Sequence, residues 1–136
     1  MNGFYLSIST LFLFVPIIIY LCNKNKPISE TILALLLLIN IILSFSFWIN
    51  PIEKSSIHIY DGFFAKISYI LFIIYILFIK KIDYKIKIVS LIILLLTLIM
   101  FYYSNINSKK WCSNPHLVYH FIFHLLSSIG CSIAFL

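Results

Sequence analysis

The sequence predicts an all-α protein, an integral membrane bundle of five transmembrane helices that forms one domain. Apolar residues make up 62% of the 136 residues and charged residues only 10%. The charged residues gather in short segments between apolar runs, and these runs are long enough to cross a bilayer core of about 30 Å. A water-soluble domain of this length could not bury so many apolar side chains, so a soluble fold is excluded.

The first two spans are predicted at about residues 4–21 and 31–49. Pro16 should kink the first span, because proline cannot donate an intrahelical hydrogen bond. This segment lacks a basic start and a small-residue cleavage site, so we interpret it as a retained span rather than a signal peptide. Pro51 ends the second span. Trp48, close to that end, is typical of an anchor at the membrane interface.

The remaining spans are predicted at about residues 57–79, 88–103 and 115–135. The third opens with His58 and Asp61, which lie one helical turn apart on one side. Lys66 is expected to point away from them and to reach the headgroups. The fourth span is almost uniformly apolar and is interpreted as scaffold. The three cysteines form no CxxC motif, and no disulfide is expected between Cys112 and Cys131.

The lysines predict the direction in which the chain threads the membrane. The loops after the first and third spans carry more of them than the loops after the second and fourth. The positive-inside rule therefore places the N-terminus outside and the C-terminus in the cytosol. The net charge of +6 is explained in this way and predicts no nucleic-acid partner. The same threading brings the end of the second span and the starts of the third and fifth to one membrane face.

A polar stripe runs along the last span. At about 100° per residue, its members fall within an arc of roughly 80°; they are His116, His120, His124, Ser127 and Cys131. Polar side chains that face hydrocarbon are costly, so the stripe should face protein, a cofactor or water. The threading brings it to a depth similar to that of His58, Asp61 and Ser44.

These residue types can form a metal-dependent hydrolase site. His120 and His124, four residues apart, can bind one metal ion from a single helix turn. Catalytic zinc usually takes a third protein ligand, which His58 or His116 could supply, and we favour His58. Asp61 could hold and deprotonate a metal-bound water, and Ser44 could donate to an oxyanion. At headgroup depth, the substrate would be a lipid amide or ester.

The motifs resemble the integral-membrane hydrolase superfamily of alkaline ceramidases and adiponectin/progestin receptors. Asp61 matches its acid early in the third span, and His120-Phe-Ile-Phe-His124 matches its closing His-x3-His. The resemblance implies zinc held by histidines, with Ser44 and Asp61 positioning the water or the oxyanion. The chain departs from the family in having five predicted spans instead of seven. Trp48 also stands where the family's Ser-x3-His motif has its histidine.

Two other classes of protein agree with the same residues. A membrane cytochrome could hold non-covalent haem between histidines of different helices, such as His58 and His120. A structural or assembly protein would use the histidines for hydrogen bonds between helices, and an oligomer could conduct protons through them. A Soret band would identify the cytochrome. Metal-free protein that folds normally after triple histidine substitution would identify the structural protein.

Overall fold

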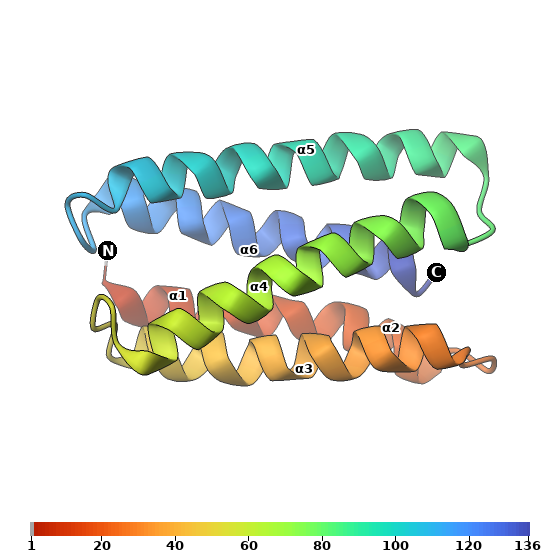
Figure 1. Cartoon of the computed structure of the whole chain (residues 1–136), viewed down its shortest axis with the longest axis horizontal. Helices are drawn as coiled ribbons and strands as arrows, with labels where there is room; N and C mark the ends of the chain where they lie inside the picture. Colours follow the sequence, from red (N-terminus) through yellow and green to blue (C-terminus); the bar gives the residue numbers. More distant parts are fainter. Residues whose placement is uncertain (1) are drawn as a thin grey trace.

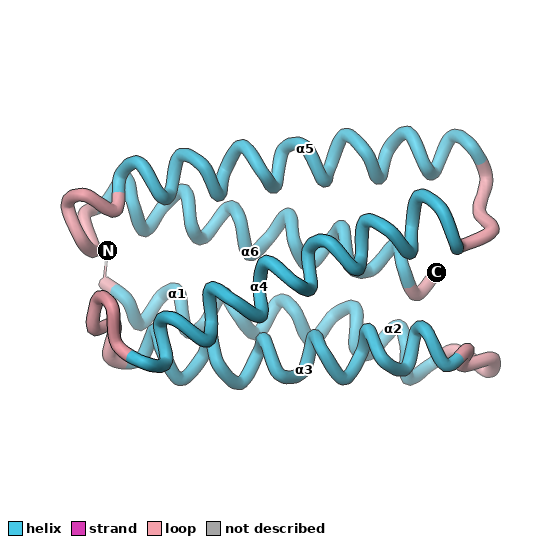
Figure 2. The backbone as a smooth tube through the Cα atoms, in the orientation of Figure 1, coloured by secondary structure: helices cyan, strands magenta, loops and turns pink. Residues whose placement is uncertain are grey.

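The computed structural model describes residues 2–136 as a bundle of antiparallel helices joined by short loops (Figures 1 and 2). Its elements are α1 (Gly3–Thr10), η1 (Leu11–Leu13), α2 (Phe14–Cys22), α3 (Ile28–Ile49), α4 (Ser56–Ile74), η2 (Tyr75–Ile79), α5 (Tyr84–Asn107) and α6 (Asn114–Ala134). Here η1 is a 3-10 turn and η2 a π-helical turn. In the described residues no strand is present, so the all-α prediction is confirmed.

Five helical segments are long and apolar enough to cross a membrane, as in a multi-pass membrane protein. They are Gly3–Cys22, Ile28–Ile49, Ser56–Ile79, Tyr84–Asn107 and Asn114–Ala134, so each predicted span is present. The largest difference is α5, which extends four residues beyond the predicted span at both ends. Hydropathy marks the apolar part of a helix, whereas lysines and asparagines can continue its backbone hydrogen bonds outside that part.

The first span is interrupted close to Pro16, as predicted. Pro16 has no amide hydrogen for the carbonyl of Phe12, which lies in the 3-10 turn η1. The Ser128 hydroxyl of α6 donates to this carbonyl instead, at 2.6 Å. A neighbouring helix thus supplies the hydrogen bond that the kink removes, as a span surrounded by hydrocarbon requires.

Small residues let α1 approach the end of α3 and the loop that follows. A Cβ atom on Gly3 would lie 2.8 Å from Cγ of Pro51, so only glycine permits this contact. One turn later, the Ser7 hydroxyl donates to the Phe45 carbonyl at 3.1 Å. Small residues four apart are a common means of close packing between membrane helices. The contact fixes α1 beside the α3 end at which the site lies.

Helix α4 crosses from one side of the bundle to the other. It packs along α3, whereas α5 packs along α6 (Figure 1). The second half of the α4 span reaches α5: the Tyr69 hydroxyl donates to the Leu94 carbonyl at 2.8 Å, and η2 also contacts α5. One layer contains α3 and α4, and the other contains α5 and α6. The two layers therefore separate towards the start of α4. At the η2 end, the buried Glu30 carboxylate accepts from Lys80 at 2.8 Å and from Tyr75 at 2.7 Å. This ionic cluster joins α3 to the end of the α4 span.

Candidate functional site

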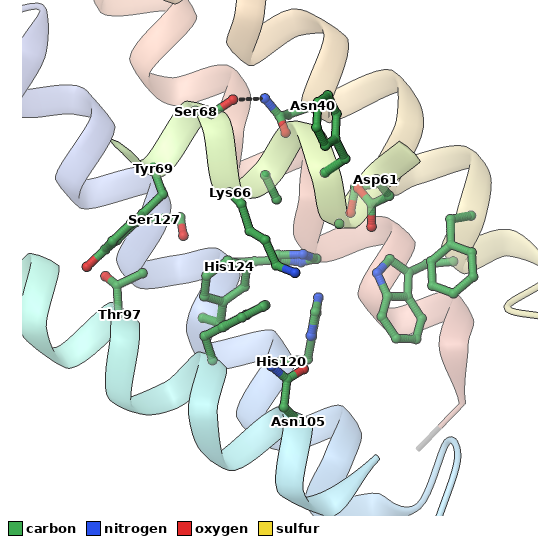
Figure 3. A pocket seen from close by; sticks show the side chains of 18 of the residues that line it. Asn40, Asp61, Lys66, Ser68, Tyr69, Thr97, Asn105, His120, His124 and Ser127 are labelled. Atoms are coloured by element: carbon green, nitrogen blue, oxygen red, sulfur yellow. Dashed lines mark hydrogen bonds between the residues drawn. The ribbon is translucent and has the colours of Figure 1, made fainter. Parts of the chain in front are cut away.

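A cavity of about 610 Å³ lies between the layers, towards the end of the bundle where α4 and α6 begin. The four histidines all contribute to its wall, together with Ser44 of α3 and Asp61 of α4. The prediction that threading gathers these polar residues around one space is therefore confirmed. Figure 3 shows Asp61 of α4 facing this space from one side, with His120 and His124 of α6 facing it from another.

Asp61 is held against α3. Its carboxyl group is hydrogen-bonded to the Ser44 hydroxyl. Deeper in the same helix pair, the Asn40 amide nitrogen donates to the Ser68 hydroxyl, as Figure 3 shows. These two pairs place the acid and the amide along one wall of the cavity.

His124 lines the cavity and is joined to α1 through its Nδ1. Its Nδ1 lies 2.6 Å from the Ser9 hydroxyl, and that hydroxyl donates its only proton to the Leu6 carbonyl at 2.7 Å. With the Ser9 proton directed to Leu6, the neutral imidazole donates from Nδ1 and its Nε2 is unprotonated. His120 lies beside it, with the ring centroids 4.8 Å apart, and its Nδ1 is 3.0 Å from the Ser104 hydroxyl.

His58 and His116 bind the loops that precede their own helices. The Lys54 amide donates to Nδ1 of His58 at 2.9 Å, and the Cys112 amide donates to Nδ1 of His116 at 3.1 Å. Both amide donors have a positive φ, 61° at Lys54 and 58° at Cys112, so the two loops share one geometry. Because Nδ1 accepts from a backbone amide, the proton of each neutral ring sits on Nε2.

The proton on Nε2 of His58 decides whether the predicted ligands can bind one zinc ion together. A zinc ligand needs a lone pair on the coordinating nitrogen, and His58 has none free in this arrangement. Within residues 2–136, no group of three His, Cys, Asp or Glu side chains is arranged to hold a metal ion. The set His58, His120 and His124 therefore does not fit a three-ligand zinc centre, and a haem bound through His58 meets the same obstacle. The zinc prediction rests on the sequence alone.

Trp48 is not the interfacial anchor that the sequence predicted. Its side chain is 1% exposed and packs against the rings of Trp111, His116 and His120. Trp48 packs inside the bundle because these three aromatic neighbours lie on α6 and in the loop before it. Within the described residues its Nε1 hydrogen has no acceptor. Trp48 is thus an unpaired donor in the wall of the cavity.

Lys66 is the residue that sequence reasoning missed. It was expected to point away from the Asp61 face, but it lines the cavity, and Figure 3 shows its side chain reaching towards His120 and His124. Its long side chain can reach around the helix, so its angular position on α4 did not reveal its direction. The available signal was a lysine well inside an apolar span, where an ionisable side chain is a functional hypothesis by default.

The cavity opens sideways between α4 and α5. Its wall includes exposed residues of the first half of α4, among them Ile59, Phe63 and Lys66, and residues of α5 such as Phe101. The polar side chains concentrate towards the start of α4. The other direction is lined by apolar side chains, including Leu13, Leu37, Phe72, Leu94 and Leu126, together with uncharged polar ones such as Asn40, Ser68 and Thr97. The ionisable side chains thus lie at one end of the space, and the other end is lined by uncharged side chains, many of them apolar.

Each cysteine is free, as expected for Cys112 and Cys131, and burial raises the pKa of the Cys112 thiol in its loop.

No protein-family model, curated protein or solved structure matches the chain.

Proposed function

We propose that this chain is a membrane protein that binds an amphiphilic lipid, with the polar headgroup in the cavity and the hydrocarbon extending towards its uncharged end. The observation that carries the proposal is the unsatisfied polar wall of a space that opens sideways. Nε1 of Trp48 and Oδ1 of Asn40 are buried and have no hydrogen-bond partner among the residues that the structure describes. Such groups cost free energy in an apolar medium unless a ligand or water reaches them.

The shape of the cavity supports the same proposal. A volume of about 610 Å³ is in the range of small-molecule sites, which are mostly apolar with a few placed polar groups. Its opening lies between spans, where a lipid can diffuse in without leaving the bilayer. As part of this proposal, the lysine distribution orients the N-terminus outside and the C-terminus in the cytosol.

A tryptophan at Gly62 tests lipid binding. Gly62 lines the cavity, and a Cβ atom there meets no heavy atom within 4 Å, so a larger side chain starts in open space beside the opening. We expect Gly62→Trp to retain about tenfold less lipid through detergent purification, measured by mass spectrometry of the extracted lipids. Ile70→Trp is the matched control, because Ile70 is exposed on the same helix and does not line the cavity. Equal retention by both variants and the parent chain would contradict the proposal and favour a structural protein.

A second candidate, hydrolysis of a lipid amide or ester, is favoured by two groups on opposite walls. The Asp61 carboxyl group and the unprotonated Nε2 of His124 can exchange protons with water and with a leaving group in the space between them. We expect release of fatty acid from a lipid ester or amide to fall at least about a hundredfold in Asp61→Asn. The same preparations, analysed for zinc, test the metal prediction, which requires zinc to be lost in His120→Ala. Activity unchanged in Asp61→Asn would reject this candidate.

A further inference from the structure

Two opposite charges line the cavity without forming a pair. In the described part of the chain, the only ion pair within 4 Å joins Lys80 to Glu30. Asp61 and Lys66 therefore face the same space from α4 as separate charges (Figure 3). Ionisable groups within an apolar span normally find a partner of opposite charge. Asp61 is hydrogen-bonded to Ser44, but within residues 2–136 neither group has an opposite charge within 4 Å.

Asp61 and Lys66 leave α4 at different heights. Lys66 follows Asp61 by five residues, so its Cα atom lies about 7.5 Å further along the helix at 1.5 Å per residue. Because α4 begins at Ser56, Asp61 is the nearer of the two to the start of the helix. The lysine side chain is long and leans back towards the helix N-terminus, so its ammonium can approach the level of Asp61. A ligand that satisfies both groups carries a cation beside Asp61 and an anion beside Lys66, as a phosphoethanolamine headgroup does.

We propose that the ligand is a zwitterionic phospholipid with a primary ammonium group, of the phosphatidylethanolamine type. This inference rests on the proposed lipid binding and names its headgroup. Asp61 accepts hydrogen bonds from the ammonium, while Lys66 binds the phosphate, and the acyl chains extend towards the apolar lining around Phe72 and Leu94. A carboxylate only accepts hydrogen bonds. A primary ammonium therefore gains charge-assisted bonds that a quaternary ammonium, which has no N–H, cannot form.

Competition between defined lipids tests this assignment. The delipidated chain in detergent is offered equal amounts of dioleoyl phosphatidylethanolamine, phosphatidylcholine and phosphatidylglycerol, and bound lipid is counted by native mass spectrometry. We expect phosphatidylethanolamine to be preferred about tenfold over each of the others. Asp61→Asn should remove the preference over phosphatidylcholine while phospholipid still binds. Lys66→Met should weaken all three, yet leave binding of an uncharged diacylglycerol unchanged.

The outcomes separate this inference from the function on which it rests. If lipid binds but the parent chain takes the three phospholipids equally, the headgroup assignment is overturned and lipid binding stands. If neither variant changes the preference, Asp61 and Lys66 are satisfied by each other and the assignment is again overturned. If no lipid binds to any preparation and Gly62→Trp behaves as the parent chain, both fail. The preference of the parent chain decides the matter even where a variant does not fold.

Discussion

Removing the Glu30 side chain should destabilise the bundle by about 3–5 kcal/mol, the largest effect that we expect from a single substitution. The carboxylate is 4% exposed and accepts from both Lys80 and Tyr75. In Glu30→Ala the lysine ammonium keeps its buried position but loses its counter-charge, and an uncompensated buried charge is strongly destabilising. The free energy of unfolding in mixed micelles, from a denaturant titration, measures the loss.

Two matched variants separate charge from shape. Glu30→Gln keeps an acceptor of the same size and should recover part of the loss. Glu53→Ala removes an acid from the exposed loop before α4, where substitutions usually change stability by less than about 0.5 kcal/mol. If Glu30→Ala and Glu53→Ala were equally stable, the ionic cluster would not join α3 to the α4 span in the way described.

The second large effect is expected at His116. His116→Leu leaves the half-buried Cys112 amide without an acceptor and removes a ring that packs against Trp48 and Trp111. A buried donor that loses its partner costs about 1–3 kcal/mol, so we expect a loss of that size from the same unfolding measurement.

His58→Leu provides the control, since it removes the same kind of bond from an exposed loop. There, water can replace the imidazole as acceptor for the Lys54 amide, and the loss should stay below about 1 kcal/mol. Equal losses in the two variants would show that burial of the loop does not set the strength of this bond.

Much of the architecture could be predicted because a bilayer imposes few choices. The five spans follow from apolar run length, and the alternation of spans brings Ser44, Asp61 and the histidines of α6 to one end of the bundle without any knowledge of packing. Connectivity fixes the depth of each of these residues in the bundle, and their depths decide which of them can meet in the cavity wall.

The direction in which each side chain points could not be predicted in the same way. Lipid is as apolar as a protein core, so an apolar helix carries only a weak signal of its rotation about its own axis. For this reason Trp48 was assigned to the interface and Lys66 to the headgroups, whereas both line the cavity. The use of His58 as an acceptor for the Lys54 amide depends on a positive φ that no sequence pattern marked.

The ionic cluster at one end of the α4 span and the opening at the other make the molecule unequal across the bilayer. Lys80 and Glu30 close the bundle on one side, while the charged side chains of the cavity lie in the opposite half. If the chain binds lipid as proposed, the headgroups that reach Asp61 and Lys66 come from a single leaflet. The composition of that leaflet, and not of the other, would then set the occupancy of the cavity.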